Sequence, residues 1–366
     1  MEQQASVPSF DPRHVYQNLP TAYTFVHPAE RGAVAARLPR VVFIEVTNHC
    51  NLLCETCPRT FVTYERPRTL SWRKFCRIVD QFSDMQRAVL HGIGEPLLNK
   101  DLPRMIKHLK ERGLAVLFNT NATLLDEARG RALIASGLDE MRCSVDGTDP
   151  DTYARVCGRP LFHKVVENLR LFTQLQRELN SDKPRVSLWM IGMRENIVEL
   201  PALVRLAARM GVPKVYLQRM VYYLDGDDAP GLMGGDHALF DDFDLLTNRV
   251  IAKAEALAEE LGITLRASGA TDPRHSLEAL GQRVPRPWSA CLRPWTTAYV
   301  TANGNCLPCC ISPFATRDYE ALQMGNLFEC DFGDIWNGER YQAWRTALLS
   351  ERPPTPCKGC GVHWSL

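Results

Sequence analysis

Three cysteines, Cys50, Cys54 and Cys57, lie on one short loop directly after the apolar run 41–46. A closed structural zinc site needs four ligands, and no fourth cysteine lies close to this loop in the sequence. Thiolates also hold iron–sulfur clusters, and three of them leave one iron of a [4Fe–4S] cluster open to another ligand. The spacing therefore favours a cluster whose open iron does chemistry, with half of a zinc site as the alternative.

A second group of cysteines lies toward the C-terminus, around a predicted β-hairpin whose turn contains Asn303-Gly304. Four thiolates suffice for a closed site, and from the residues alone a zinc ribbon and an iron–sulfur cluster are equally compatible with them. A cluster with four protein ligands has no open iron and therefore suits electron transfer. These thiols are two beside the hairpin and the distant pair Cys357 and Cys360, which has Cys-x2-Cys spacing.

The composition predicts a cytoplasmic protein that binds metal through its cysteines. The chain has 366 residues, of which 45% are hydrophobic, and a formal net charge of +1, which argues against a nucleic-acid or membrane partner. Its N-terminus lacks the pattern of a signal peptide, and no apolar run reaches membrane-spanning length. Thirteen cysteines without an export signal favour metal binding over disulfides, because the cytosol keeps thiols reduced.

Strand and helix patterns alternate from residue 41 onward, which predicts a parallel sheet wound right-handedly in an α/β fold. A doubly wound sheet and an incomplete barrel are both compatible with this order. Functional residues are expected at the carboxyl ends of the strands. The predicted strands are 41–46, 88–93, 115–119, 140–145, 186–191 and 214–218, with helices that include 71–82, 102–112, 162–179 and 197–210.

The Cys-x3-Cys-x2-Cys loop after the first strand resembles the signature of radical S-adenosylmethionine (SAM) enzymes. Thr56 departs from the aromatic residue that often precedes the third cysteine, but a subgroup with Cys57-Pro58-Arg59 often lacks it. The resemblance implies a partial (β/α)6 TIM-like barrel and a [4Fe–4S] cluster whose open iron binds SAM. One electron then splits SAM into methionine and a 5′-deoxyadenosyl radical, which abstracts hydrogen from the substrate.

Segments at the ends of the second, third and fourth strands resemble SAM-binding motifs of the same family. Residues 91–96 resemble Gly-Gly-Glu-Pro with Ile93 in place of the first glycine, 119–122 resemble Thr-Asn-Gly, and 143–147 resemble Ser-Leu-Asp-Gly. Simple turn formation is the alternative for the first two segments. The resemblance implies these cofactor-binding residues: Gly94, Glu95, Asn119, Asn121, Ser144 and, as partner of the SAM carboxylate, Arg159.

The C-terminal cysteines resemble the opening of the SPASM motif, in which Gly304 precedes Cys309 by a fixed spacing after Cys291. A full SPASM domain carries further cysteines and two auxiliary clusters. The set present here resembles the shortened "twitch" form, which implies one auxiliary [4Fe–4S] cluster with Cys291, Cys309, Cys357 and Cys360 as its ligands. The predicted domains are 1–40 as an extension, 41–225 as the barrel, 226–285 as a helical connector and 286–366 as the twitch or SPASM-like domain, a β-hairpin plus a helix.

The family resemblance leaves the substrate open. The short segment before Cys50 and the acidic, Gly-rich segment 222–228 favour a small polyhydroxylated substrate such as a sugar, aminocyclitol or nucleoside, which would be oxidised, decarboxylated or epimerised. A peptide-modifying enzyme and a non-catalytic zinc protein are the alternatives. An electron donor such as flavodoxin or ferredoxin is the expected partner. No acid or base is assigned, and the candidates for a second hydrogen-atom step are Cys306, Cys310, Tyr222 and Tyr223.

Overall fold

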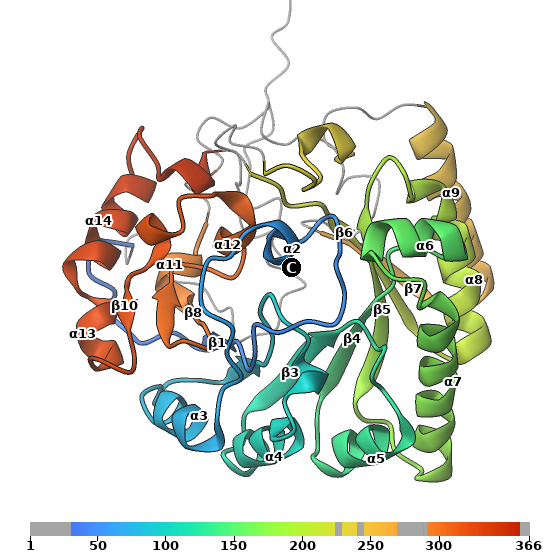
Figure 1. Ribbon diagram of the computed structural model, residues 1–366, viewed down its shortest axis with the longest axis horizontal. Coiled ribbons are helices and arrows are strands. Elements are labelled where there is room, and N and C mark those ends of the chain that lie inside the picture. Colours follow the sequence, from blue (N-terminus) through green and yellow to red (C-terminus); the bar gives the residue numbers. More distant parts are fainter. Residues whose placement is uncertain (1–30, 224–228, 240–244, 269–287, 289–290, 359–366) are drawn as a thin grey trace, which may run out of the picture.

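The computed structural model describes residues 31–223, 229–239, 245–268, 288 and 291–358 (Figure 1). Cys360, a predicted ligand, and most of the acidic segment 222–228 lie outside these residues.

One continuous sheet of ten strands organises the described residues, in the order β10-β9-β8-β1-β2-β3-β4-β5-β6-β7. The strands from β1 to β7 are parallel, and the register pairs Val42 with Ala88 and Ala88 with Val116. The prediction of an α/β partial barrel is confirmed. Its six predicted strands are β1 (Val41–Ile44), β2 (Arg87–Val89), β3 (Ala115–Thr120), β4 (Glu140–Ser144), β5 (Arg185–Gly192) and β6 (Lys214–Arg219).

The helices between these strands form an outer layer around the curved sheet (Figure 1). Their apolar side chains face the strands; α8, for example, buries Leu203, Val204 and Ala207. The residue that follows α8, Gly211, adopts a left-handed conformation. The helices of this layer are α3 (Trp72–Val79), α4 (Leu102–Glu111), α5 (Glu127–Ala135), α6 (Pro150–Cys157), α7 (Phe162–Glu178), α8 (Leu200–Met210) and α9 (Leu245–Glu260).

The interval 226–285, predicted to be a helical connector, contains the helix α9 and also a strand. Strand β7 (Thr264–Ala267) pairs in parallel with β6 and extends the sheet. Its alternating exposed and buried side chains fit a strand that ends a sheet. The domain boundaries themselves remain a prediction.

The C-terminal region continues the same sheet on the other side of β1. Strand β8 pairs in parallel with β1 and antiparallel with β9, so the predicted hairpin is confirmed. Gly304 has a φ of 90° in its turn, which suits a residue without a Cβ. The elements are α11 (Arg293–Thr296), β8 (Thr297–Val300), β9 (Asn305–Leu307), α12 (Ser312–Ala315), β10 (Gly325–Asn326), α13 (Phe332–Trp336) and α14 (Glu339–Leu348).

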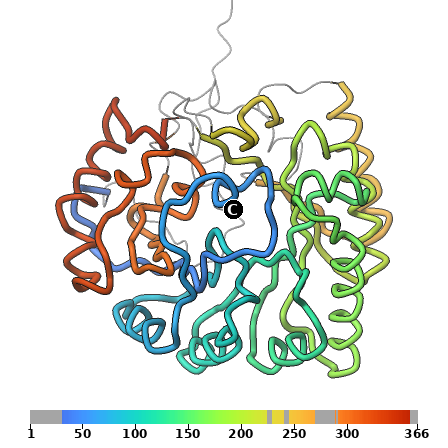
Figure 2. Tube along the Cα trace, viewed as in Figure 1, coloured from blue at the N-terminus to red at the C-terminus, as the bar shows by residue number. Residues whose placement is uncertain are grey.

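The segment after β1 carries the three-cysteine loop and the short helix α2 (Pro58–Phe61). It arches over the centre of the molecule, inside the ring of helices (Figures 1 and 2). Among the described residues, no helix combines the length and apolarity needed to cross a bilayer.

Candidate functional site

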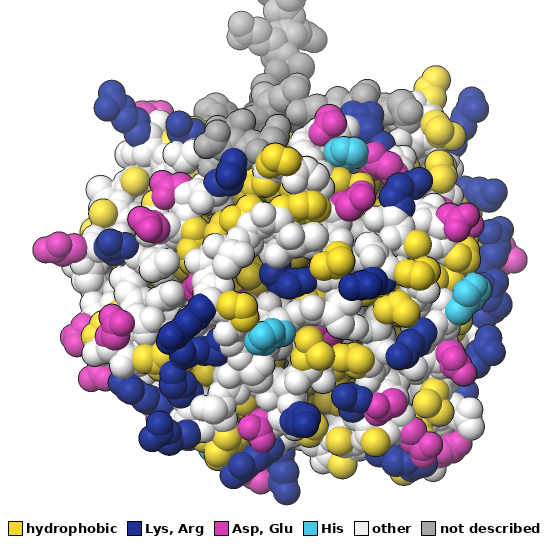
Figure 3. Space-filling model, viewed as in Figure 1, with side chains coloured by type: hydrophobic (Ala, Val, Ile, Leu, Met, Phe, Trp, Pro, Cys, Tyr) yellow, Lys and Arg dark blue, Asp and Glu magenta, His cyan; other side chains and the backbone are white. Residues whose placement is uncertain are grey.

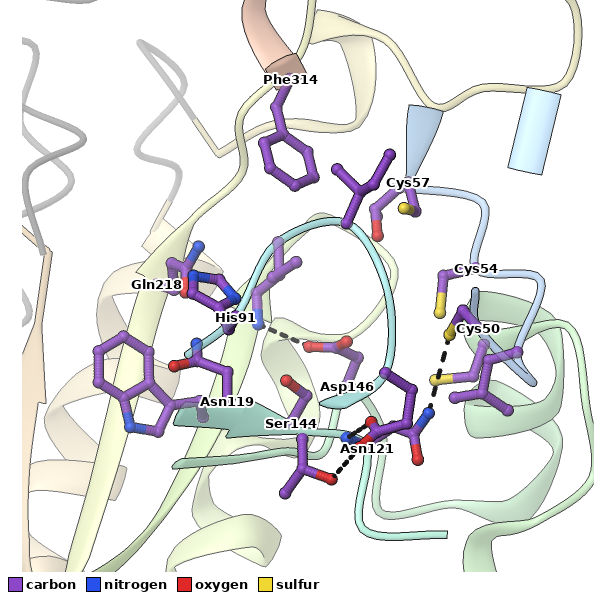
Figure 4. Close-up of a pocket in the computed structure, with 18 of the residues that line it drawn as sticks. Cys50, Cys54, Cys57, His91, Asn119, Asn121, Ser144, Asp146, Gln218 and Phe314 are labelled. Carbon is purple, nitrogen blue, oxygen red and sulfur yellow. Dashed lines mark hydrogen bonds between the residues drawn. The ribbon is translucent and has the colours of Figure 1, made fainter. Parts of the chain in front are cut away.

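A pocket lies at the carboxyl ends of the strands, between the cysteine loop and the C-terminal region (Figure 4). Side chains from β3, β4, β5 and β6 form its base, and residues 310–314 form part of its wall. The predicted site residues that line it are Cys50, Cys54, Cys57, Gly94, Glu95, Asn119, Asn121 and Ser144.

Backbone hydrogen bonds fix the cysteine loop to the end of α6. The N–H of Leu53 donates to the carbonyl of Cys157 at 3.2 Å, and that of Glu55 donates to the carbonyl of Val156 at 2.9 Å. Within the loop, the guanidinium of Arg59 donates to the carbonyl of Leu52 at 2.7 Å. These contacts with α6 and within the loop fix its position, and its three cysteines line the pocket.

The environment of the three thiols raises their pKa values, so they stay protonated until a metal replaces the protons. The hydrogen bond with Cys157, together with burial, raises the pKa of Cys54, and burial raises the pKa of Cys57 to about 12. Burial also raises the pKa of Cys50. Metal binding at these thiols must therefore release protons.

The arrangement of the thiols fits a cluster of several irons. Each thiolate of a [4Fe–4S] cluster binds a different iron, so its ligands stand apart from one another. Three thiols spread along one loop at the mouth of a pocket meet that requirement.

Glu95 joins the ends of two strands. Its buried carboxylate accepts hydrogen bonds from the N–H of Leu97 at 2.9 Å, the hydroxyl of Thr120 at 2.8 Å and the N–H of Asn121 at 2.7 Å. Burial raises its pKa to about 7. These bonds use much of the hydrogen-bonding capacity of the carboxylate. Glu95 therefore holds the loops after β2 and β3 together.

Gly94 lies where the loop after β2 crosses the backbone after β1. A Cβ at this position would lie 2.1 Å from the carbonyl oxygen of Thr47, which no side chain can tolerate. The adjacent N–H of Glu95 donates to the carbonyl of His49 at 2.8 Å. The glycine therefore brings the loop against the segment that leads into the cysteines.

Two asparagines and a serine face the same space from β3 and β4 (Figure 4). The amide of Asn121 donates to the side-chain oxygen of Asn51 at 3.0 Å and lies 3.9 Å from the sulfur of Cys50, so it contacts the cysteine loop directly. The side-chain oxygen of Asn119 is buried and has no hydrogen-bond partner among the described residues. It offers an acceptor to a bound molecule, as does the half-buried hydroxyl of Ser144.

Arg159 does not join this group. It follows Gly158 in the turn between α6 and α7, its side chain is exposed, and it is not part of the pocket lining. Its predicted contact with the SAM carboxylate thus has no support from its position.

The prediction did not assign His91 and Asp146, which also line the pocket. Asp146 accepts a hydrogen bond from the N–H of Ile191 at 2.7 Å, and burial raises its pKa to about 6. Burial, and to a smaller degree the nearby Arg142, lower the pKa of His91 to about 4, so it is neutral. Both residues lie in the strand-end segments that the sequence analysis selected. Their positions close to Gly94 and Ser144 in the sequence could have indicated that they line the same pocket.

The structure brings some of the C-terminal cysteines together. Burial raises the pKa of Cys291 to about 11, and the neighbouring thiols of Cys309 and Cys310 contribute. Cys309 is half-buried, whereas Cys310 lines the pocket and its sulfur lies 2.6 Å from the guanidinium of Arg293. Cys357 is half-buried, and Cys360 lies outside the described residues.

The remaining predicted candidates lie elsewhere. Cys306 is fully buried on β9, while Tyr222 is packed partly buried against the core. Tyr223 is buried and its hydroxyl contacts that of Tyr64.

A buried carboxylate connects the pocket to the C-terminal hairpin. Glu45, which follows β1, accepts hydrogen bonds from the N–H of Ile93 at 2.9 Å, the hydroxyl of Tyr299 at 3.1 Å and the N–H of Ala302 at 3.2 Å. A Cβ at Gly92 would lie 2.2 Å from this carboxylate. Glu45 therefore contacts both the loop after β2 and the hairpin after β8, and burial raises its pKa to about 7.

A second carboxylate holds the same hairpin from the other side. Glu65 accepts hydrogen bonds from the hydroxyls of Thr301 at 3.0 Å and Tyr319 at 2.7 Å. It also accepts from the amides of Asn303 at 2.8 Å and Asn305 at 2.7 Å. Because residue 65 follows the cysteine loop, the two thiol-bearing regions are joined through polar contacts as well as through the sheet.

Comparison with known families identifies both regions. Residues 44–207 match the model of the radical SAM superfamily, and residues 291–361 match that of the SPASM iron–sulfur cluster-binding domain. The chain therefore contains a radical SAM domain followed by a SPASM domain. These domains bring a [4Fe–4S] cluster that binds SAM and an auxiliary iron–sulfur cluster. The alternative of a non-catalytic zinc protein is not supported.

Relatives align with most of the chain. The PqqA peptide cyclase of Xanthomonas campestris is 26% identical over 330 residues, which cover 88% of this chain and 79% of the cyclase. The corresponding protein of Granulibacter bethesdensis is 25% identical over 327 residues, with the same coverage. The crystal structure of Streptococcus suis SuiB bound to SAM has a TM-score of 0.63 at 17% identity, covering 88% of this chain and 72% of SuiB. This last likeness shows that the fold is shared.

Proposed function

We propose that this protein is a radical SAM enzyme that modifies a peptide. The observation that carries the proposal is the similarity to PqqA peptide cyclases, which extends over 88% of the chain and thus spans both the radical SAM and the SPASM regions. SuiB, which shares the fold, has been crystallised with its precursor peptide SuiA. These comparisons favour the peptide alternative over the small polyhydroxylated substrate that sequence analysis put first.

The apolar part of the pocket lining supports a peptide substrate. Trp189 and Ile191 of β5, Met220 and Val221 after β6, and Phe314 of α12 form an apolar surface there. The ring of Trp189 is fixed by stacking on Tyr216, with a centroid distance of 3.9 Å. Such a surface fits an amino-acid side chain, whereas a sugar would leave its hydroxyls without partners.

The polar side of the pocket would hold the cofactors. The thiols of Cys50, Cys54 and Cys57 would bind the first cluster, and Asn119, Asn121 and Ser144 would orient SAM by hydrogen bonds. When bound, the cluster and SAM supply a radical that removes a hydrogen atom from the substrate. The chain itself positions that atom by the apolar wall and, through Cys310 and Phe314, closes the pocket with the auxiliary domain.

The test is turnover of reconstituted protein with SAM and reductant against a peptide library and a matched panel of sugars and nucleosides. We expect 5′-deoxyadenosine to form together with a peptide product lighter by two hydrogens. Turnover of a sugar or nucleoside, with no peptide consumed, would overturn the proposal. A Phe314→Asp variant should lose peptide turnover while retaining both clusters.

A further inference from the structure

A second pocket lies on the outer surface, between α7 and α8 and away from the strand ends. Its floor is apolar and is formed by Phe162, Val166 and Leu206, of which Phe162 and Leu206 are buried. Its rim carries three exposed arginines, Arg170, Arg205 and Arg209. We call these six residues the arginine groove.

The arginines of the groove have no partner within the described part of the chain: no hydrogen bond or ion pair joins their guanidinium groups to another side chain or carbonyl there. Other arginines of this protein do have such partners; Arg112, for example, pairs with Asp80. Arg205 and Arg209 are spaced four residues apart on α8, where like charges destabilise a helix. Three uncompensated cations around one apolar floor indicate an anionic ligand.

Further cations lie beyond the groove. Figure 3 shows Lys and Arg side chains along the edge of the molecule over α7 and α8, with some Asp and Glu side chains among them. Cations gathered around an apolar floor attract an acidic macromolecule and steer its approach.

A contact between two aromatic rings links the arginine groove to the pocket that holds the first cluster site. The ring of Phe162, on its floor, lies 5.9 Å from that of Tyr153, which lines the catalytic pocket. Tyr153 is a residue of α6, whose last residue, Cys157, hydrogen-bonds the thiol of Cys54. The side chain of Leu53, between two of the cysteines, is 44% exposed, so the cysteine loop itself also reaches the surface.

We propose that the arginine groove is the docking site of an acidic one-electron carrier protein. The inference rests on the proposed function only in that reductive SAM cleavage consumes one electron per turnover, which must come from outside the chain. In the step, one electron leaves the reduced carrier and enters the first cluster; no covalent bond forms or breaks. An acidic peptide would also match the charge, but a substrate must enter the catalytic pocket, whereas an electron can cross the protein between groove and cluster.

The experiment measures the rate at which reduced flavodoxin, an acidic carrier, bleaches the cluster absorbance of the reconstituted protein. We expect the double variant Arg205→Glu and Arg209→Glu to lower the second-order rate constant about tenfold at low salt and to weaken its dependence on ionic strength. Reduction by dithionite should be unchanged, because it needs no docking.

The matched control reverses two charges far from the groove, with Arg73→Glu on α3 and Lys107→Glu on α4, both of which are exposed. Flavodoxin should reduce the cluster of this control variant at the same rate as that of the unmodified protein. Equal slowing in both double variants, or no slowing in the groove variant, would overturn the proposal. Normal reduction with weakened binding of the peptide substrate would make the groove a peptide site and also overturn it. Bleaching is followed without SAM or peptide, so the result does not depend on whether the proposed function holds.

Discussion

The two thiol-bearing regions of this protein are built in different ways. The first places Cys50, Cys54 and Cys57 on one loop whose shape is set by local backbone bonds and by contact with α6. The second collects its thiols from distant segments, with Cys291 before α11 and Cys309 beyond the hairpin. The first can be assigned from spacing alone, whereas the second depends on how the hairpin, α14 and the C-terminal residues come together.

The largest expected effect comes from removing a thiol of the first loop. A Cys54→Ala variant should abolish SAM cleavage, a loss of at least about 10³-fold, and iron should fall from about eight to about four per chain, because the first cluster loses a ligand. Iron and sulfide analysis with detection of 5′-deoxyadenosine measures both. Cys157→Ala is the control, since this thiol touches Cys54 but is not a predicted ligand; iron loss there would contradict the assignment.

Adjacent cysteines test the second region. Cys309→Ala should lose about four irons per chain while still cleaving SAM, so that cofactor is consumed without peptide product. Cys310→Ala should keep its iron, because this side chain faces the catalytic pocket and contacts Arg293. Iron analysis and product yield distinguish the two. If Cys310→Ala alone lost iron, the predicted ligand would be the wrong member of the pair.

A smaller effect is expected where the two regions meet. Burial raises the folded-state pKa of Glu45 from 4.5 to about 7. Its contribution to stability is therefore fully present below pH 4.5 and is lost as the pH rises through 7, by roughly 3 kcal/mol. Denaturant unfolding of the reconstituted protein should show this decline, and a Glu45→Gln variant should show a flatter one.

The stability of the Glu45→Gln variant at low pH provides a second measurement. At pH 5 the Glu45 side chain is protonated, and Glu45→Gln should be less stable by about 1–3 kcal/mol, since the amide nitrogen of Gln accepts no hydrogen bond whereas the hydroxyl oxygen of the acid can accept one. Parallel pH profiles of the two proteins would show that Glu45 does not titrate as described.

The smallest effect concerns the predicted SAM contacts. Arg159→Ala should change the KM for SAM less than about twofold, because its side chain is exposed outside the pocket. Asn121→Ala should raise that KM about tenfold, since it removes a hydrogen bond at the cysteine loop. Dithionite-driven SAM cleavage measures both, and a larger effect at Arg159 would restore the original assignment.

Sequence reasoning located residues of the pocket and of the hairpin turn where their geometry depends on neighbours along the chain. The cysteine loop, Gly94, Asn121 and the hairpin turn at Gly304 all follow from short patterns whose geometry is local. It was silent where function depends on contacts between distant segments. Nothing near Glu45 in the sequence indicates that Tyr299 and Ala302 would bind it.

The substrate class shows the same limit. The acidic segment that favoured a polyhydroxylated substrate lies mostly outside the described residues, and the apolar wall is assembled from β5, the residues after β6, and α12. In the sequence, the apolar residues of that wall cannot be distinguished from residues of the hydrophobic core, because each belongs to an element that also packs against the sheet. Only the fold places Trp189 and Phe314 in one pocket.

The pairing of β8 with β1 has a consequence for how this chain is made. Strand β1 is entirely buried, with β2 on one edge and β8 on the other. On the ribosome β1 emerges well before β8, its second neighbour, so one apolar edge of β1 stays unpaired until the residues between the two strands have been translated. A chain truncated before Thr297 would keep that edge permanently and should aggregate.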